Sequence, residues 1–184
     1  MLSRPRDPEA LIDEEAFADD EFMPYWAELW PAALELAEAL PASLAGLRVI
    51  ELGCGLGMPS LVAAARGAVV TALDWAEPAV ELLRGNAERN GLSVAAVHAD
   101  WRAYGGDFDL VLGSDLLYEA RNAAALLELL PRLAPEAILA EPGRPHAAGF
   151  FRQAAETWTI EPLGARVARL TRTTREGRRL PEDE

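Results

Sequence analysis

Three glycines at alternating positions, Gly53, Gly55 and Gly57, separate an apolar run from a helix-like run in the stretch VIELGCGLGMPS. A glycine-rich turn between a strand and a helix leaves backbone N–H groups free beside the positive end of the helix, so it can bind a nucleotide-like ligand. The dinucleotide fingerprint G-x-G-x-x-G needs glycine where Met58 stands, and the P-loop needs a lysine, which the chain lacks. The spacing therefore indicates a nucleotide-like ligand without a pyrophosphate.

Carboxylates and a tryptophan stand where the other parts of a nucleoside need partners. Asp74 ends the second apolar run, where an acidic side chain can accept hydrogen bonds from ribose hydroxyls. Asp100 ends the third run and precedes Trp101, and the two offer an acceptor for an exocyclic amine beside an aromatic face. Glu51 lies inside the first apolar run. A buried acid needs a partner, and a cationic ligand supplies one.

The elements that must position these side chains alternate between apolar runs and helix-like runs. Strands that are apolar throughout are buried on both faces, which indicates a parallel sheet in an α/β layer fold. Right-handed crossovers place the carboxyl ends of the parallel strands on one rim, so the glycine turn and the carboxylates should meet there. Strands are expected at 47–53, 68–74, 93–100, 108–115 and 136–142, helices at 31–40, 58–67, 77–91, 123–133 and 145–157, and a closing hairpin at 158–174.

The composition limits the kind of protein this chain can be. With 184 residues, 51% of them hydrophobic, it should make one domain with a buried core. The net charge of −13 argues against binding to nucleic-acid phosphates and favours a cationic or neutral partner. One cysteine, Cys54, and two separated histidines, His98 and His146, favour no metal site. No membrane span or leader is indicated, so a cytoplasmic protein is expected.

Several short motifs together carry a family resemblance. The stretches ELGCGLG, LDW, ADW and GSDLLYE, in this order and at these intervals, resemble the class I S-adenosylmethionine-dependent methyltransferases. Within that class, the chain resembles the small seven-β-strand protein-lysine methyltransferase group, which is nicotinamide N-methyltransferase-like. The resemblance lies in WPAALELAEAL before the glycine turn, NAERNG after Asp74, and a D-x-x-Y motif from Asp115 to Tyr118. The resemblance covers roughly residues 26–144.

The resemblance implies a fold, a cofactor and roles for individual residues. The fold is a single Rossmann-like domain, α/β, with a mostly parallel seven-stranded sheet, helices on both faces and a C-terminal antiparallel hairpin. The cofactor is S-adenosylmethionine, with S-adenosylhomocysteine as product. Asp115 and Tyr118 are the implied catalytic residues. The implied cofactor-binding residues are Trp30, Glu51, Gly53, Gly55, Gly57, Asp74, Trp75, Asp100, Trp101 and Ser114.

The implied reaction needs positioning more than it needs reactive protein groups. The methyl group leaves a sulfonium by in-line displacement, without a metal or a covalent enzyme intermediate. The expected acceptor is a nitrogen on a lysine-type protein side chain or on a small amine. Asp115, Tyr118 or a nearby backbone carbonyl could orient an amine or relay its proton. Alternatives are a small-metabolite methyltransferase, a non-catalytic module that binds the cofactor, and an NAD-dependent oxidoreductase, which Met58 disfavours.

Each of these side chains also has a purely structural interpretation. Asp74 could cap the helix that follows it, because aspartate is a good N-cap residue. Trp30 and Trp101 could fill the core. Asp115 and Tyr118 could serve only as a cap and a packing residue.

The two ends of the chain differ from its middle in charge. Residues 1–22 are expected to form an acidic N-terminal arm, residues 23–175 the methyltransferase domain, and residues 176–184 a charged C-terminal tail. The ends can be two solvated segments. A sharper hypothesis is that arginines hold the arm over the acceptor channel, so that deleting residues 1–21 weakens cofactor or substrate binding. These arginines are Arg166, Arg169, Arg172, Arg175, Arg178 and Arg179.

Overall fold

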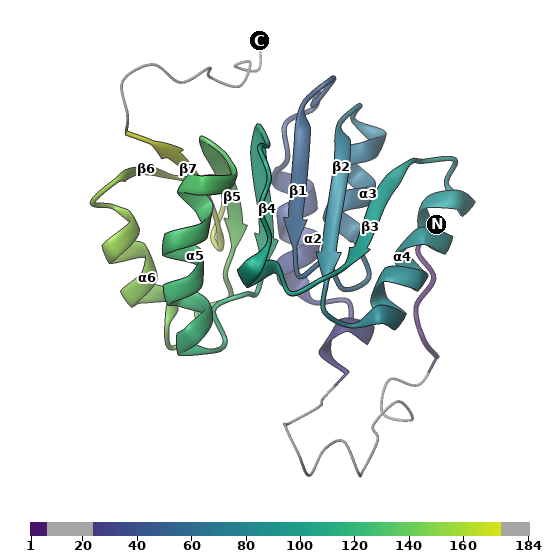
Figure 1. Cartoon of the computed structure of the whole chain (residues 1–184), viewed down its shortest axis with the longest axis horizontal. Helices are drawn as coiled ribbons and strands as arrows, with labels where there is room; N and C mark the ends of the chain where they lie inside the picture. Colours follow the sequence, from purple (N-terminus) through teal and green to yellow (C-terminus); the bar gives the residue numbers. More distant parts are fainter. Residues whose placement is uncertain (7–23, 174–184) are drawn as a thin grey trace.

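The computed structural model describes residues 1–6 and 24–173, which contain a seven-stranded sheet with helices on both faces (Figure 1). The strands are β1 (Arg48–Leu52), β2 (Val69–Asp74), β3 (Val94–His98), β4 (Leu110–Ser114), β5 (Glu136–Ala140), β6 (Trp158–Pro162) and β7 (Val167–Arg172). The helices are α2 (Pro31–Ala39), α3 (Met58–Ala65), α4 (Glu77–Arg89), α5 (Ala120–Leu133) and α6 (Ala147–Ala154), with short 3-10 helices η2 (Tyr25–Ala27) and η3 (Trp101–Ala103).

The sheet has the strand order β3-β2-β1-β4-β5-β7-β6, which confirms the predicted mostly parallel sheet. Strands β1 to β5 pair in parallel, and β7 runs antiparallel to both β5 and β6. Leu52 near the end of β1 is level with Leu73 and with Gly113. The carboxyl ends of the central strands therefore reach the same rim, on the lower side of the sheet in Figure 1.

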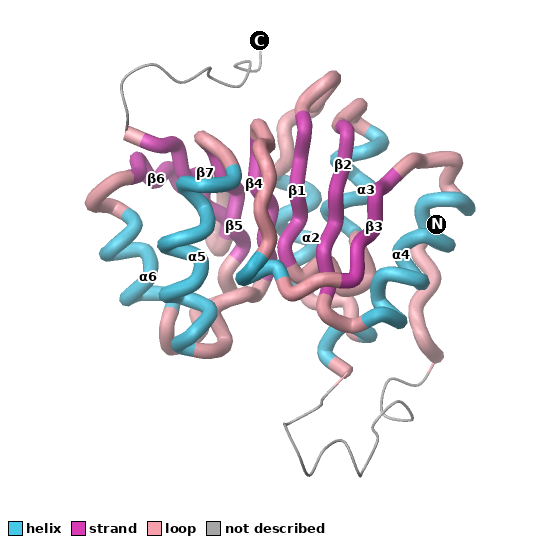
Figure 2. The backbone as a smooth tube through the Cα atoms, in the orientation of Figure 1, coloured by secondary structure: helices cyan, strands magenta, loops and turns pink. Residues whose placement is uncertain are grey.

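Helices cover both faces of the sheet, so the central strands are largely apolar. In Figures 1 and 2, α5 and α6 lie in front of the sheet and α2 and α3 behind it. Every residue of β5 is buried, and β4 is buried except for its last residue, Ser114. Successive side chains of a strand point to opposite faces, so each central strand contributes to both hydrophobic layers.

Two helix boundaries differ from the prediction by three residues, and hydrogen bonds account for each difference. Helix α5 begins at Ala120 and not at residue 123, because Asn122 already donates to the carbonyl of Glu119 and, through its side chain, to that of Leu116. Helix α6 ends at Ala154 and not at residue 157, because the carbonyl of Thr157 accepts from Thr173 in the closing hairpin.

The first residues of the chain contact α4. Ser3 and Asn86 exchange hydrogen bonds of 2.8 and 3.1 Å between backbone and side-chain amide, and Asn90 donates to the carbonyl of Met1 at 2.7 Å. Most of the predicted acidic arm and the C-terminal tail lie outside the described residues, so the arginine-held arm stays a hypothesis. Arg166, one of the arginines assigned to it, pairs instead with Glu35 of α2 at 2.9 Å.

The helices of the described segments are short or carry charged residues. None of them is long and apolar enough to cross a membrane.

Candidate active site

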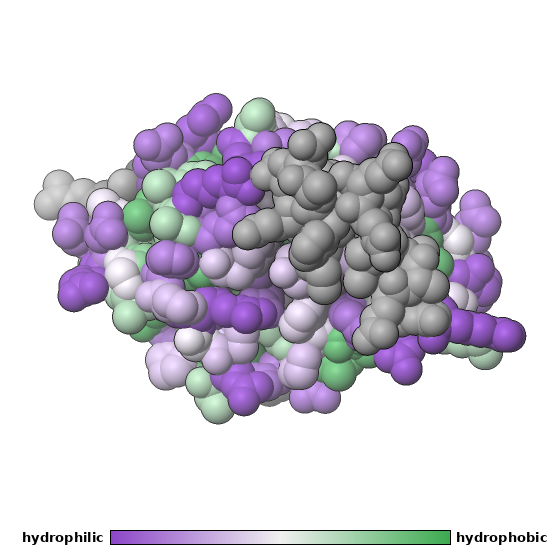
Figure 3. Space-filling model, turned by 90° about the horizontal axis from the view of Figure 1, so that it is seen from below, coloured by the Kyte–Doolittle hydropathy of each residue, from purple (hydrophilic) through white to green (hydrophobic). Residues whose placement is uncertain are grey.

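The carboxyl rim of the sheet carries most of the side chains selected from the sequence. Loops after β1, β2, β4 and β5 meet there, and Figure 3 views the molecule from this side. Hydrophilic side chains predominate among the coloured atoms visible in that view. The rim has two parts, the glycine turn after β1 and the loops after β4 and β5.

The glycine turn adopts the backbone conformation that its glycines permit. Gly53, Gly55 and Gly57 have φ angles of 62°, 49° and 74°, in the left-handed region where side chains are strained. A Cβ on Gly57 would stand 2.3 Å from the nearest methyl carbon of Leu83, and one on Gly55 would stand 3.3 Å from the carbonyl oxygen of Trp26. Chain segments therefore close tightly around the turn.

Glu51 is fully buried in β1, directly before the turn. Its Oε2 accepts a hydrogen bond of 2.9 Å from the backbone N–H of Ser60 and a second one from the Ser60 hydroxyl. Its Oε1 is buried and has no hydrogen-bond partner. Burial raises the pKa of Glu51 to about 8, although the bonds from Ser60 oppose the rise. The first strand thus ends beside a carboxylate with one unused acceptor.

Asp74, at the end of β2, ties the turn to the next helix. Its Oδ2 accepts from the N–H of Gly55 at 2.8 Å, and its Oδ1 accepts from the N–H of Ala76 at 2.9 Å. Burial raises the pKa of the Asp74 carboxyl, and these two N–H groups oppose the rise. The N-cap position of α4 is occupied by Ala76 and not by Asp74. Asp74 therefore braces the glycine turn as well as the start of the helix.

The aromatic and acidic residues after β2 and β3 lie beside the turn with different exposures. Trp101 is buried, and its Nε1 lies 3.9 Å from where a Cβ on Gly53 would stand. Trp75 is 40% exposed, and its carbonyl contacts His98 Nε2 at 2.8 Å. The carboxylate of Asp100 is paired with Arg102, whose Nε and Nη2 lie 2.9 and 3.0 Å away, and Arg102 lowers the pKa of Asp100.

Asp115 follows β4 in a strained backbone conformation. Its φ of 54° is the only positive one among the described residues other than glycine. Its N–H donates to the carbonyl of Ala140 at 2.9 Å, and the Asn122 amide donates to the carbonyl of Leu116 at 3.0 Å. The first two residues of the D-x-x-Y loop are therefore tied to β5 and to α5. Strain held in this way by surrounding hydrogen bonds is typical of functional sites.

The Asp115 carboxylate is paired with Arg144, which the sequence analysis did not select. Arg144 Nε and Nη2 donate to the two carboxylate oxygens, each at 2.7 Å, in a bidentate ion pair. The guanidinium also lies over the indole ring of Trp30, 5.8 Å from the ring centroid. The hydrogen bonds to Asp115 raise the pKa of the Arg144 guanidinium.

A row of aromatic rings continues from this pair. The Tyr25 ring lies 6.2 Å from that of Trp30 and 6.2 Å from that of Tyr118. Trp30 Nε1 donates to the carbonyl of Tyr25 at 2.8 Å. Because the backbone of Trp26 lies against Gly55, the short helix η2 connects the glycine turn with the Asp115 loop.

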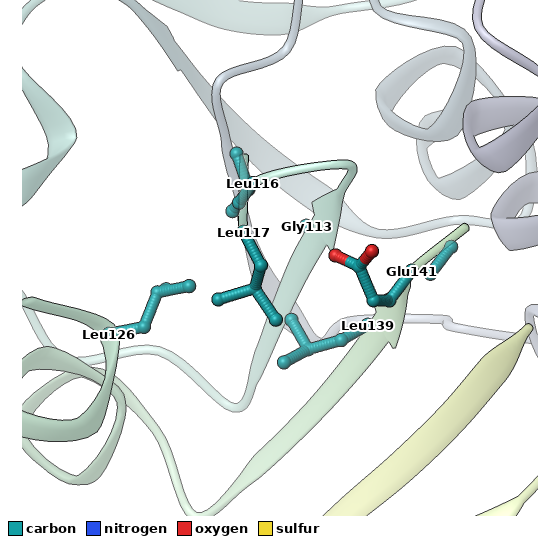
Figure 4. A pocket seen from close by; sticks show the side chains of 7 residues that line it. Gly113, Leu116, Leu117, Leu126, Leu139 and Glu141 are labelled. Atoms are coloured by element: carbon teal, nitrogen blue, oxygen red, sulfur yellow. The ribbon is translucent and has the colours of Figure 1, made fainter. Parts of the chain in front are cut away.

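Glu141 lies between β5 and Arg144, and it is 8% exposed. Its Oε1 accepts from the N–H groups of Gly143 and Arg144 at 3.0 and 2.7 Å, whereas its Oε2 is buried without a hydrogen-bond partner. Burial raises the pKa of its carboxyl. Figure 4 shows the side chains of Leu117, Leu139 and Glu141 directed toward one another around a small cavity. Glu141 thus holds the turn from which Arg144 reaches Asp115.

Within residues 1–6 and 24–173, histidine, cysteine, aspartate and glutamate form no group of three that could hold a metal ion. Cys54 is buried, and burial raises the pKa of its thiol.

Known proteins resemble this chain in sequence and in fold. A family model described as a methyltransferase domain matches residues 49–136, from β1 to the start of β5. The zebrafish (Danio rerio) protein N-lysine methyltransferase METTL21A is 39% identical over 121 residues, which are 58% of this chain and 55% of the relative. The chain carries a class I methyltransferase domain.

Other relatives of the class I methyltransferase domain differ in what they act on. The 23S rRNA (uracil(1939)-C(5))-methyltransferase RlmD of Halomonas elongata is 35% identical over 66% of this chain and 21% of its own length. The magnesium protoporphyrin IX methyltransferase of Synechocystis PCC 6803 shares the fold, with a TM-score of 0.63, 22% identity and coverage of 77% of this chain and 76% of the other. The chain spans about half the length of METTL21A and a fifth of that of RlmD.

The candidate site includes four residues that were not predicted from the sequence. They are Tyr25, Ser60, Glu141 and Arg144. A signal existed for Glu141, because it follows an apolar strand just as Asp74 and Asp115 do. No comparable signal marked Arg144, whose role depends on the turn geometry that Glu141 sets.

Proposed function

We propose that this domain transfers a methyl group from S-adenosylmethionine to a nitrogen atom, on a lysine-type protein side chain or on a small amine. The observation that carries the proposal is the position of the Asp115 loop and its aromatic row directly beside the glycine turn, linked to it by η2. A donor site and an acceptor site must adjoin in this way for a direct transfer. A cytoplasmic location remains a prediction.

The residues on the glycine side fit S-adenosylmethionine in charge and shape. The three left-handed glycines let the chain turn sharply at the end of β1, which brings the backbone of the turn next to Asp74. The unpartnered Oε1 of Glu51 suits the cationic amino group of the cofactor's methionine part. Asp74 would accept from the ribose hydroxyls, and Trp101 would flank the adenine. Trp30, Trp75, Asp100 and Ser114 remain proposed cofactor contacts, with Asp100 shared between Arg102 and the ligand.

The cofactor would supply a methyl group on a sulfonium, so that an N–C bond forms as the C–S bond breaks. The protein's part is to hold the acceptor nitrogen in line. An acceptor that binds as a cation must lose a proton to a neighbouring base or to water before its nitrogen lone pair can attack the methyl group. Asp115 is held in place by the hydrogen bond from its own backbone N–H to the carbonyl of Ala140, so its carboxylate can orient an N–H group of the acceptor. Tyr118, which is partly exposed beside Tyr25, would line the entrance.

The test is transfer of tritiated methyl from the cofactor into a host lysate, separated into acid-precipitable and small-molecule fractions. We expect label in protein, reduced at least a hundredfold by Asp115→Ala because that variant loses the oriented acceptor contact. Label only in small molecules would show that the acceptor is a metabolite and not a protein. No label in either fraction, with S-adenosylhomocysteine still bound, would favour a binding module. Label removed by ribonuclease would contradict the exclusion of nucleic acid.

Asp74→Asn tests the cofactor side independently of the acceptor. An amide oxygen cannot accept from both Gly55 and Ala76 as the two carboxylate oxygens do, and its NH₂ group would face a donor. We expect at least a tenfold loss of affinity for S-adenosylhomocysteine in calorimetry.

The matched control for Asp74→Asn is Asp109→Asn. Asp109 also accepts a backbone N–H, that of Arg48, but at the opposite end of the sheet. It should alter stability and leave the affinity unchanged. Equal affinities in both variants would remove Asp74 from the cofactor site.

A further inference from the structure

A cationic side chain of the protein itself occupies the proposed acceptor side. The Arg144 guanidinium makes two hydrogen bonds of 2.7 Å to the Asp115 carboxylate and lies over the Trp30 ring. A carboxylate together with an aromatic face is how proteins commonly hold a lysine, arginine or ammonium ligand. The site is therefore built to bind a cation, and in this structure the cation is Arg144.

The exposures of the two partners show which of them faces the solvent. The Arg144 side chain is 37% exposed, whereas that of Asp115 is 9% exposed. An incoming group that binds Asp115 must therefore compete with the guanidinium covering it. A neutral group cannot replace the charge that Asp115 would lose, because a buried carboxylate without a cationic partner is costly.

The turn that carries Arg144 is anchored through its backbone and not through the guanidinium. Glu141 Oε1 accepts from the N–H groups of Gly143 and Arg144, and Gly143 has a φ of 97°. These bonds do not depend on where the Arg144 side chain points. The guanidinium can leave Asp115 while the turn keeps its place, and the unpartnered Oε2 of Glu141 leaves a second carboxylate near the vacated position.

We infer that the Arg144 guanidinium occupies the position that the acceptor takes when it binds. The substrate class is then a cationic side chain, an ammonium or a guanidinium, which binds by displacing Arg144 from Asp115 and Trp30. This inference rests on the proposed function in one respect, that the Asp115 loop is the acceptor side. It makes Arg144 a specificity-determining residue. Removing the charge of Arg144 should raise the affinity of the site for other cations and leave its affinity for neutral acceptors unchanged.

The experiment titrates the full chain with fragments of the two candidate side chains. The probes are n-butylammonium and methylguanidinium chloride, with n-butanol as the uncharged control at matched ionic strength. Binding is followed by the Trp30 indole N–H signal in nitrogen-15 NMR, assigned with Trp30→Phe. We expect Arg144→Gln to bind at least one cation at least tenfold more tightly than the wild type, with n-butanol unchanged.

Two further variants keep the inference falsifiable. Arg144→Lys retains the charge but loses the bidentate fork, so its affinity should lie between those of the wild type and Arg144→Gln. Asp115→Asn combined with Arg144→Gln should lose the gain. The inference is overturned if Arg144→Gln binds the cations no more tightly than the wild type, if n-butanol gains equally, or if the gain persists without the Asp115 charge.

A failure of the Arg144 inference can be distinguished from a failure of the proposed function. Melting temperatures and S-adenosylhomocysteine affinity are measured on the same samples, and the cation titration is run with and without S-adenosylhomocysteine. Loss of all S-adenosylhomocysteine binding would contradict the donor assignment while the cation titration still reports on Arg144. If Arg144→Gln fails to fold, the cation affinity of Arg144→Lys is compared with that of the wild type. The inference requires Arg144→Lys to bind the cations more tightly.

Discussion

Gly57→Ala is expected to lower the free energy of unfolding by about 2 to 5 kcal/mol and to weaken S-adenosylhomocysteine binding at least tenfold. The left-handed φ of 74° costs an alanine about 1 to 2 kcal/mol. The new Cβ would stand 2.3 Å from the Leu83 Cδ1 atom and 3.0 Å from its Cγ, and such overpacking costs about 1 to 3 kcal/mol more. Urea denaturation and calorimetry measure the two effects.

The matched control for Gly57→Ala is Gly46→Ala. Gly46 has a nearly equal φ of 77°, but nothing lies within 4 Å of where its Cβ would be. It should therefore cost only the backbone penalty, about 1 to 2 kcal/mol, and leave ligand affinity intact. If the two variants behave alike, the close approach of α4 to the glycine turn has no energetic importance.

Glu51→Gln is expected to stabilise the ligand-free protein at alkaline pH and to flatten its stability profile. The pKa of Glu51 is raised from 4.5 to about 8 by burial. The stability that the protonated carboxyl contributes is therefore complete below about pH 4.5 and is lost progressively as the pH rises to about 8. The loss is on the order of 4 kcal/mol. Glutamine avoids it, because its oxygen can still accept from Ser60 while its NH₂ group replaces the unpartnered Oε1.

Urea denaturation at a series of pH values between 4 and 9 measures this effect, with Glu81→Gln on the exposed face of α4 as control. A wild-type profile no steeper than that of Glu51→Gln would show that Glu51 does not titrate in this range. The variant also separates stability from function. It should bind S-adenosylhomocysteine at least tenfold more weakly, because an amide cannot pair with the ligand's ammonium as a carboxylate does.

Proton release on binding offers a second measurement of the same contact. An ammonium beside Glu51 favours the ionised carboxylate, so binding near pH 7 should expel a proton. Calorimetric heats of the wild type should then vary with the ionisation enthalpy of the buffer, and those of Glu51→Gln should not. Equal heats in all buffers for the wild type would place the ligand's charge away from Glu51.

The sequence was informative where one local rule decides the structure. Continuous apolar strands between helices led to the parallel sheet and the common rim, and the alternating glycines led to the tight turn. The unusual charge of Glu51 inside an apolar strand pointed to a buried acid. Each of these features depends on residues close together in the chain.

The features that the sequence did not reveal depend on contacts between distant segments. The pair between Asp115 and Arg144 joins the loops after β4 and β5, and requires the left-handed φ at Asp115 and the turn held by Glu141. Tyr25 is brought to the site because η2 lies on the glycine turn. The pairing of Asp100 with Arg102 is local, but nothing in the sequence favours it over a ligand contact.

The antiparallel strand β7 has a consequence for the order in which the site can form during synthesis. The glycine turn and its supports, from η2 to η3, involve residues 25–103. The loop that carries Glu141 and Arg144, by contrast, needs β7 beside β5, and the N–H of Glu141 donates to the carbonyl of Arg166 at 2.8 Å. Chains fold from the N-terminal side as they leave the ribosome. A growing chain would therefore complete the proposed donor half early and gain the proposed acceptor half only when β7 emerges.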